Sequence, residues 1–430
     1  KGQTTREMTK TMDQVLGLRC VLCGAEYGVD EVLYVCPDHG DEGILDVVYD
    51  YDRIGLQFTR QALAGNPERS IWRYRSLLPV LPDSQVPPLT VGWTPLYSVK
   101  RLRELWGLPH LWVKDDGRQP TASFKDRASA VGIVKALEMG RDVICAASTG
   151  NAASSLAGLS ASMGLRNVIF VPETAPEAKV AQLLVFGATV VLVRGSYDQA
   201  FDLSLEATRL YGWYNRSSAY NPYLSEGKNT AALEVCEQLD WDPPDRIFVS
   251  VGDGCIIGGL GKGIRDLRAL GLIDRAPKLM GVQAEGSKVL YEAWKSQGEE
   301  IVPVEPTTLA DSISVGVPRD RIKALRAVRE TSGEFVVVSD EEILEAMRVL
   351  GRTAGVFAEP AGAASLAGLH KMLREDRVDP EERIVVLVTG NGLKDVNSAI
   401  RAVEAPQSIE PTVDNLRRLV HRLGIEAVTD

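Results

Sequence analysis

The stretch Pro120-Thr-Ala-Ser-Phe-Lys-Asp-Arg127 places Lys125 among small residues, just before a helical pattern that extends from Ala128 to Met139. The positive end of a helix dipole lowers the pKa of a nearby lysine and so favours its neutral amine. A neutral amine can form a Schiff base with an aldehyde. The alternative is a surface lysine that pairs with Asp126.

Around this stretch, short β-branched runs alternate with helical patterns. A second helical pattern extends from Asn151 to Met163, and the capping box Ser339-Asp-Glu-Glu342 begins another helix. Strands are predicted at residues 142–145, 167–171, 189–193, 246–251, 335–338 and 384–388. This alternation predicts an α/β fold with parallel sheets. The units are too many for one sheet, so we expect two doubly wound α/β domains.

A chain of 430 residues has room for two or three domains. We expect a small N-terminal unit over residues 1–45 and the α/β region over residues 46–430. A smaller lobe at about residues 128–242 would be inserted in the larger lobe, and Pro243-Pro244 marks the crossing. A final helix near Val413 to Leu423 carries one apolar face, which indicates a packing surface, either within the chain or at a subunit contact.

The N-terminal unit contains two short turns with the ligand types that zinc prefers. Cys20 and Cys23 are followed, after twelve residues, by Cys36 and His39. Four such ligands complete a tetrahedral site, so the metal would be structural. A short strand is predicted at Val32–Val35. The alternatives are ordinary buried thiols, or a zinc ribbon that has lost its metal.

Composition and charge exclude several classes of protein. The formal net charge is −10, from 48 basic and 58 acidic residues without a basic block, which argues against a nucleic-acid partner. No apolar run reaches the roughly 18 residues of a membrane helix, and residues 1–14 lack the apolar stretch of a signal peptide. Six scattered or clustered cysteines fit a reducing, cytoplasmic compartment. With four histidines in the chain, chemistry built on several histidines is not expected.

A second loop of interest reads Ala146-Ala-Ser-Thr-Gly-Asn-Ala-Ala153 and leads into a helix. Ser148, Thr149, Gly150 and the amides that follow can form a nest for an anion such as a carboxylate. Asn151 either donates to a ligand oxygen or caps the helix.

A third loop, Ser250-Val-Gly-Asp-Gly-Cys-Ile-Ile-Gly-Gly259, lies between a strand and a helix. Glycines let backbone N–H groups approach a phosphate closely. The spacing matches neither a dinucleotide fingerprint nor a Walker loop. A tight structural turn is the alternative.

A fourth loop, Val388-Thr-Gly-Asn-Gly-Leu-Lys-Asp395, also follows a β-branched run. Thr389 can hydrogen-bond a ring nitrogen without protonating it. The alternative is a strand-end turn with two permissive glycines.

Together the four loops resemble the pyridoxal phosphate enzymes of the tryptophan synthase β-like fold (fold type II), and among them the threonine synthases. The similarity covers roughly residues 18 to 400 and includes the N-terminal cysteine pattern. The matching motifs are Ser123–Arg127, Ser148–Asn151, Gly252–Ile256, Thr389-Gly390, Gly92-Trp-Thr-Pro-Leu96, Thr308–Val315 and Glu359-Pro-Ala-Gly362.

The resemblance implies a role for each loop. Lys125 would carry the cofactor as a Schiff base and then shuttle protons, with Phe124 beside it. Asn151 would contact the ring hydroxyl, Thr389 would leave the pyridine nitrogen neutral, and the substrate carboxylate would bind at Ser148, Thr149, Gly150 and Asn151. The cofactor phosphate would bind the loop formed by Gly252, Asp253, Gly254, Cys255 and Ile256. The implied reaction converts the amino-acid substrate O-phosphohomoserine and water to threonine and phosphate, in a homodimer.

Some positions depart from the threonine synthase pattern. Gly390-Asn391-Gly392 stands where Gly-His-Gly is usual, Ala152 lacks a hydroxyl, and Asp202 lies where an arginine that binds the substrate phosphate is expected. The alternatives are another fold type II enzyme: a threonine/serine dehydratase, a diaminopropionate-type ammonia-lyase, or a β-replacing synthase such as cysteate synthase. A non-catalytic amino-acid-binding protein would have no need of Lys125.

Overall fold

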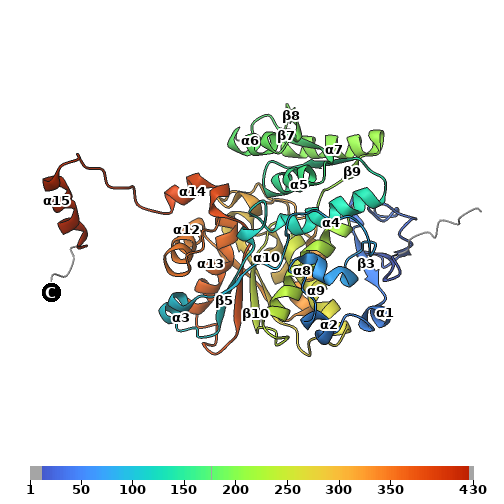
Figure 1. Cartoon of the computed structure of the whole chain (residues 1–430), viewed down its shortest axis with the longest axis horizontal. Helices are drawn as coiled ribbons and strands as arrows, with labels where there is room; N and C mark the ends of the chain where they lie inside the picture. Colours follow the sequence, from blue (N-terminus) through green and yellow to red (C-terminus); the bar gives the residue numbers. More distant parts are fainter. Residues whose placement is uncertain (1–11, 176, 426–430) are drawn as a thin grey trace, which may run out of the picture.

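The computed structural model describes residues 12–175 and 177–425, and these residues form three sheets (Figure 1). Residues 1–11 of the predicted N-terminal unit lie outside the described part. The largest sheet has the strand order β12-β11-β10-β13-β5-β4. All its neighbouring strands are parallel except β4, which pairs antiparallel with β5. The bounds are β4 Leu96–Ser98, β5 Leu111–Asp115, β10 Arg246–Ser250, β11 Lys278–Ala284, β12 Glu334–Val338 and β13 Ile384–Val388.

Both faces of this sheet are buried, and the strand residues alternate between two apolar cores. Ile247 and Val249 of β10 belong to the core on the side of α8 and α9, whereas Phe248 packs on the side of α12 and α13. Burial on both faces explains why these strands read as continuous apolar runs. The helices around the sheet are α8 Tyr223–Gln238, α9 Cys255–Ala269, α10 Val289–Lys295, α11 Arg321–Glu330, α12 Asp340–Val349 and α13 Pro360–Arg374.

A second, four-stranded sheet has the order β8-β7-β6-β9 and is parallel throughout. Figure 1 shows it at the top of the molecule, with its helices around it. The strands are β6 Val143–Ala147, β7 Arg166–Pro172, β8 Thr189–Val193 and β9 Tyr214–Asn215, and the helices are α5 Asn151–Ser162, α6 Glu177–Val185 and α7 Tyr197–Tyr211. The parallel α/β architecture predicted from the sequence is confirmed, as are the capping box that begins α12 and each of the six predicted strands to within two residues.

The N-terminal sheet is small and antiparallel, with the order β2-β1-β3. Its strands are β1 Val15–Cys20, β2 Glu26–Tyr27 and β3 Leu45–Tyr49. The predicted strand at Val32–Val35 is wrong, because only Val35 pairs, in an isolated bridge with Ile44. Residues 32–34 are coil and bend between the two turns that carry the Cys/His ligand set.

Helix α4 (Lys125–Glu138) begins three residues earlier than its sequence pattern predicted, so Lys125 is its first residue. A fully buried ion cluster fixes this end of the helix. Arg127 Nε lies 2.6 Å from Asp116 Oδ2, and its Nη1 lies 2.6 Å from Glu234 Oε1 on α8. Lys114 Nζ of β5 lies 2.7 Å from Glu234 Oε2. The cluster therefore ties the start of α4 to a strand and a helix of the large sheet.

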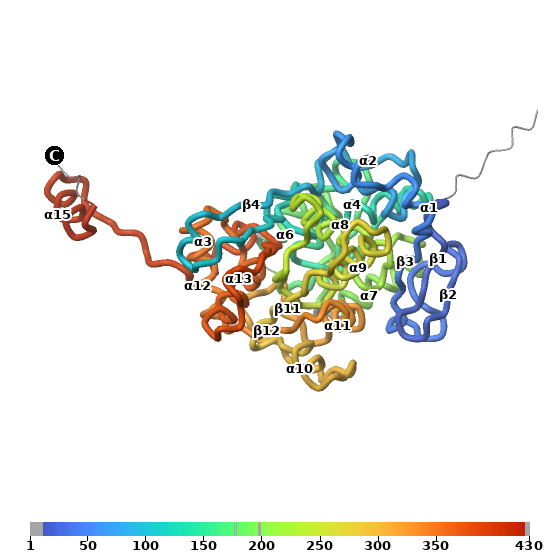
Figure 2. The backbone as a smooth tube through the Cα atoms, turned by 90° about the horizontal axis from the view of Figure 1, so that it is seen from below, coloured from blue at the N-terminus to red at the C-terminus, as the bar shows by residue number. Residues whose placement is uncertain are grey.

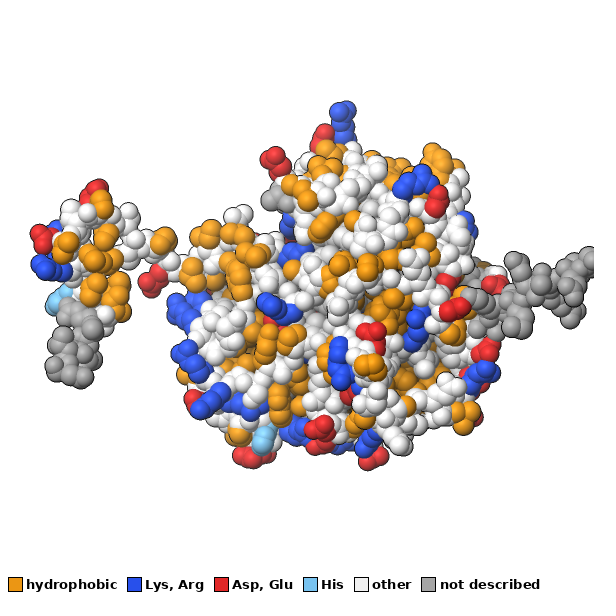
Figure 3. Space-filling model, in the orientation of Figure 1, with side chains coloured by type: hydrophobic (Ala, Val, Ile, Leu, Met, Phe, Trp, Pro, Cys, Tyr) orange, Lys and Arg blue, Asp and Glu red, His pale blue; other side chains and the backbone are white. Residues whose placement is uncertain are grey.

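The remaining helices lie at the periphery: α1 Tyr51–Gly55, α2 Arg60–Ala64, α3 Lys100–Trp106, α14 Val396–Arg401 and α15 Val413–Leu423. The predicted C-terminal helix is α15, and it stands away from the body of the chain at the end of an extended segment (Figures 1 and 2). Its apolar face contains no buried residue, so it does not pack within the chain, and Figure 3 shows it exposed. Among the described residues, no helix has the length and apolar character needed to cross a bilayer.

Candidate active site

Lys125 lies where two loops meet. The Phe124 amide donates a 2.9 Å hydrogen bond to the Thr389 carbonyl oxygen, and Ser123 pairs with Gly390 in an isolated bridge. The loop before α4 therefore lies against the loop after β13. Asp126 is not the partner of Lys125, because its buried carboxylate accepts from the Thr121 amide at 2.7 Å and from the Thr121 hydroxyl. The structure thus does not support the surface ion pair between Lys125 and Asp126.

The pKa of Lys125 is lowered to about 8, in the direction that the sequence predicted. The largest cause is burial, followed by the positive charge of Lys228 and, more weakly, that of Arg216, while Cys255 and Glu359 act in the opposite sense. A base whose pKa lies near neutrality can both accept and donate protons. The two neighbouring cations were not anticipated, because they lie far from Lys125 in the sequence.

The loop at residues 148–151 joins β6 to α5. Asn151 is the first helical residue, and Gly150 takes the capping position without a side-chain cap. The Asn151 amide nitrogen instead donates to Glu359 Oε1 at 2.8 Å and to Ser312 Oγ at 3.3 Å. The capping alternative for Asn151 is therefore wrong.

These residues border a pocket of about 120 Å³ between the two larger sheets. Thr149, Gly150 and Asn151 line one side of it, and Glu359, Lys394 and Ser312 line another. Ser148 is not part of the lining; its amide donates to the Phe170 carbonyl oxygen at 3.2 Å. Three of the four residues expected at the substrate carboxylate therefore border one cavity.

The loop at residues 252–256 joins β10 to α9. Gly254 has a left-handed backbone, with φ of +93°, and is the N-cap of the helix. A Cβ at Gly252 would lie 2.9 Å from Ile313 Cα, and one at Gly254 would lie 2.7 Å from Ala324 Cβ. Close packing thus requires both glycines, which supports the alternative that this loop is a tight structural turn. The first N–H groups of α9 have no partner within the helix, so an anion can still bind there.

Asp253 and Cys255 take different positions in this loop. The Asp253 carboxylate accepts from the Arg319 amide at 3.2 Å. The Cys255 side chain is buried, which raises the pKa of its thiol. Ile256 is half-buried at the second position of α9.

Glu359 is a site residue to which the sequence assigned no role. It is buried, and burial raises its pKa to about 7 against the opposing hydrogen bond from Asn151. A Cβ at Gly390 would lie only 2.3 Å from its Oε1. Glu359 therefore joins the Asn151 loop to the Thr389-Gly390 loop. The motif Glu359-Pro-Ala-Gly362 was the one signal in the sequence that could have found it.

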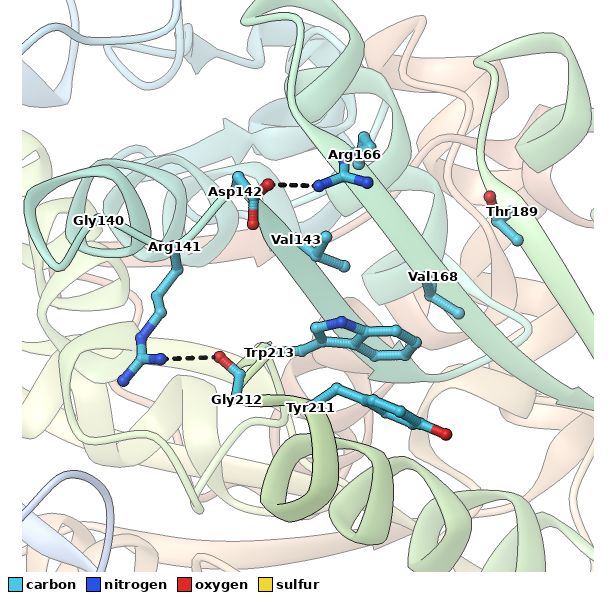
Figure 4. A pocket seen from close by; sticks show the side chains of 10 residues that line it. All are labelled: Gly140, Arg141, Asp142, Val143, Arg166, Val168, Thr189, Tyr211, Gly212 and Trp213. Atoms are coloured by element: carbon cyan, nitrogen blue, oxygen red, sulfur yellow. Dashed lines mark hydrogen bonds and ion pairs between the residues drawn. The ribbon is translucent and has the colours of Figure 1, made fainter.

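A larger cavity, of about 350 Å³, lies away from all these residues (Figure 4). It sits at the starts of β6, β7 and β8, at the sheet edge opposite the Ser148–Asn151 loop. Its charged groups are already paired, with Arg166 on Asp142 and Arg141 Nη1 3.0 Å from the Gly212 carbonyl oxygen. Ligands of α/β sheets bind at the carboxyl ends of strands, so the smaller pocket is the candidate active site.

The four residues of the N-terminal ligand set also meet. The ligand atoms of Cys20, Cys23, Cys36 and His39 all lie within 4.8 Å of one another. Cys36 Sγ is 3.9 Å from Cys23 Sγ and 3.5 Å from His39 Nδ1. All the cysteines of the chain are free. This arrangement has the ligand number and types of a structural zinc site.

Comparison with known proteins bears on the whole chain. The family described as "Pyridoxal-phosphate dependent enzyme" matches residues 88–390. The threonine synthase of Methanocaldococcus jannaschii is 40% identical over 407 residues, which are 94% of this chain and 99% of that protein. This chain belongs to the threonine synthase family of pyridoxal-phosphate dependent enzymes. The threonine synthase of Methanosarcina acetivorans is likewise 40% identical, over 94% of this chain and 98% of its own length.

Solved structures confirm the fold of this threonine synthase family member. Threonine deaminase isoform 2 from Solanum lycopersicum superposes with a TM-score of 0.62 at 19% identity, over 88% of this chain and 90% of the other. Diaminopropionate ammonia lyase from Escherichia coli gives a TM-score of 0.62 at 20% identity, over 72% of this chain and 87% of the other. Both are fold type II enzymes, and at these identities they show the fold alone.

Proposed function

We propose that this chain is a threonine synthase that converts O-phosphohomoserine and water to threonine and phosphate with pyridoxal phosphate as its cofactor. The relatives named threonine synthase, which cover nearly the whole chain, support the reaction. The observation that carries the chemistry is the position of Lys125. A lysine whose pKa is lowered to about 8 stands at a helix start, against the Thr389 loop.

The residues around Lys125 fit the cofactor. The amine of Lys125 would hold its aldehyde carbon, and Phe124 precedes it as the N-cap of α4. The glycine loop at 252–256, with the open N-terminus of α9, would hold the phosphate through backbone N–H groups. Asn151 would donate to the ring hydroxyl, and Thr389 would hydrogen-bond the pyridine nitrogen. When bound, the cofactor supplies an electron sink that stabilises negative charge at substrate carbon.

The protein's own groups would orient the substrate and move its protons. The loop at residues 148–151 would bind the substrate carboxylate at the pocket, through Thr149, Gly150 and Asn151, while Ser148 supports the loop by accepting from the Gly150 amide at 3.3 Å. Lys125 Nζ would then take and return protons at the substrate α and β carbons, for which a pKa near neutrality suits it. Glu359 would fix the Asn151 side chain through the 2.8 Å hydrogen bond.

We also propose a structural zinc ion held by Cys20, Cys23, Cys36 and His39. The support is the mutual approach of all four ligand atoms within 4.8 Å and the absence of disulfides among these cysteines. Four protein ligands leave no position for water, so this metal would stabilise the N-terminal unit rather than take part in the reaction.

Two further proposals concern the assembly of the chain and its division into domains. We propose a homodimer, as the resemblance implied. We further propose that residues 1–45 form the zinc-ribbon-like unit and that a smaller lobe at residues 128–242 is inserted in the catalytic region of residues 46–430.

The test of the reaction is direct. The purified chain is mixed separately with O-phosphohomoserine, threonine, serine, diaminopropionate and O-phosphoserine, and inorganic phosphate, ammonia and keto acid are followed. Equal amounts of phosphate and threonine from O-phosphohomoserine are expected. Ammonia from threonine, serine or diaminopropionate, without phosphate release, would replace this function by one of the other fold type II reactions.

A further inference from the structure

Two buried cations stand beside Lys125 without an assigned role. Lys228, on α8, is fully buried, and Arg216, in the loop before α8, is 2% exposed. Both charges act on Lys125, since both lower its pKa. Burying a charge is costly unless it is compensated, so a buried lysine needs a partner.

The partner of Lys228 within the protein is neutral. Its Nζ donates to Ser218 Oγ at 3.2 Å, and no carboxylate among the described residues lies within ion-pair distance. The other buried lysines nearby differ. Lys262 lies 3.1 Å from Asp266, and Lys323 lies 2.8 Å from Asp46. The buried Asp320 carboxylate interacts with the Lys228 charge from beyond that distance, so an anion bound directly at the Lys228 Nζ would complete its compensation.

Arg216 donates to the same Ser218 hydroxyl group. Its Nη1 donates to Ser218 Oγ at 3.3 Å, its Nε donates to Ser129 Oγ at 3.0 Å, and its Nη2 lies 3.5 Å from the Lys125 carbonyl oxygen. Ser218 thus stands between two cations. The adjacent Ser217 Oγ is buried and finds no hydrogen-bond partner among the described residues.

These groups adjoin the N-terminus of α9. Helices α8 and α9 are closely packed and lie side by side in Figure 2. A Cβ at Gly259 of α9 would lie 2.7 Å from Lys228 Cβ. Ala219 packs in one apolar cluster with Cys255, the first residue of α9. Two buried cations, a shared hydroxyl and a helix N-terminus therefore lie together next to Lys125.

We propose that Lys228 and Arg216, with Ser218, bind the phosphate group of a phosphate monoester beside Lys125. Arginine and lysine together, with a hydroxyl and a helix N-terminus, are the groups that hold a phosphate dianion. The monoester is either the cofactor or the substrate, and the second source rests on the proposed function. Asp202, which the sequence placed at the substrate phosphate, lies exposed on α7 instead.

The test compares Lys228→Gln, which can still hydrogen-bond Ser218, with Lys228→Arg, which keeps the charge. Lys288→Gln removes a half-exposed lysine at the N-cap of α10 and is the matched control. Dissociation constants are measured by titration of the full-length chain, first with pyridoxal phosphate and pyridoxal after cofactor removal, then with O-phosphohomoserine and homoserine on the cofactor-loaded protein.

Loss of one charge-assisted contact should weaken binding of the phosphate-bearing ligand roughly 10- to 100-fold. If the cofactor is the monoester, Lys228→Gln weakens pyridoxal phosphate and leaves pyridoxal unchanged. If the substrate is the monoester, it weakens O-phosphohomoserine and leaves homoserine unchanged. Lys228→Arg should retain most of the affinity, and Lys288→Gln should change neither pair. The proposal would be overturned if Lys228→Gln kept the wild-type ratio of dissociation constants both for pyridoxal phosphate against pyridoxal and for O-phosphohomoserine against homoserine.

Thermal unfolding of the cofactor-free chain keeps the proposal testable if Lys228→Gln binds no ligand at all. Inorganic phosphate should raise the midpoint of the wild type and not that of Lys228→Gln. The midpoint of Lys228→Gln without phosphate should equal or exceed that of the wild type, because a buried charge without a direct ion-pair partner is gone. A lower midpoint for Lys228→Gln without phosphate would mean that the lysine serves the fold, and would refute the site. If Lys228→Gln binds pyridoxal phosphate no more tightly than pyridoxal while the wild type fails to turn over O-phosphohomoserine, the phosphate site is supported and the proposed function is wrong.

Discussion

The buried ion cluster at the start of α4 gives a prediction whose magnitude follows from the structure. Glu234 is fully buried, and it accepts from Arg127 Nη1 at 2.6 Å, Lys114 Nζ at 2.7 Å and the Trp93 amide at 2.8 Å. Arg127 is two residues from Lys125, so this carboxylate holds the turn of helix that carries the reactive amine. The perturbation is Glu234→Gln, which keeps the shape and removes the charge.

The size of the effect follows from the pKa of Glu234 and from the general cost of breaking a buried ion cluster. Burial would raise the pKa of Glu234, but Arg127 and Lys114 outweigh it and lower the pKa from 4.5 to about 2. A difference of 4.5 − 2 = 2.5 units, at about 1.4 kcal/mol each, is about 3 kcal/mol of stability. Because the folded pKa is depressed, this contribution is fully present above pH 4.5 and is lost as the pH falls through about 2. Removing one member of a buried ion cluster costs about 3–5 kcal/mol, which agrees.

The assay is guanidinium unfolding at pH 7, followed by circular dichroism, together with cofactor retention after gel filtration. The matched control is Glu237→Gln, one turn further along α8, which loses a buried partner of Arg73 instead. Both variants should lose stability, by about 3 kcal/mol for Glu234→Gln. Cofactor retention should fall only in Glu234→Gln, because only that variant loosens the start of α4. A loss below about 1 kcal/mol, the size of an exposed ion pair, would refute the reasoning.

Three further predictions follow from the same geometry. The pKa of Glu359 is raised from 4.5 to about 7, so the free energy of unfolding should fall by about 3 kcal/mol as the pH rises from 4.5 to 7. Glu359→Gln should abolish this pH dependence in thermal unfolding of the cofactor-free chain. A pH dependence that is the same in the variant would show that the carboxyl titrates normally. One zinc per chain should be found by metal analysis, and its removal by a chelator, or Cys36→Ser, should lower the unfolding midpoint of the N-terminal unit; a chain without metal and with the same midpoint contradicts the site. Asp202→Arg should leave the KM for O-phosphohomoserine within about twofold, since Asp202 is exposed on α7; a marked fall in KM would place Asp202 at the substrate phosphate after all.

The parallel sheets could be predicted from the sequence because their strands are buried on both faces. Runs such as Ile384–Val388 are apolar throughout, and few other structures produce such short β-branched runs between helical patterns. The alternating residues at Val32–Val35 gave the same signal without forming a strand. That segment lies between the two Cys/His turns and finds a pairing partner only at Val35.

The candidate site could be predicted only where its residues belong to a continuous motif. Lys125, Asn151, Gly254 and Thr389 stand at helix starts or in strand-end loops that local patterns mark. Glu359, Arg216 and Lys228 are single charged residues in the sequence, and their importance comes from burial and from meeting Lys125 in space. The suggested pair of Lys125 and Asp126 failed because adjacent residues on a helix point in different directions.

The central claim is that Lys125 holds the cofactor, and chemical trapping tests it most directly. The purified chain is reduced with borohydride, digested, and examined by mass spectrometry for a peptide that carries the reduced pyridoxyl group. The label is expected on the Lys125 Nζ, with loss of both label and visible absorbance in Lys125→Ala. A label on another lysine, or an unaltered visible band in Lys125→Ala, would contradict it.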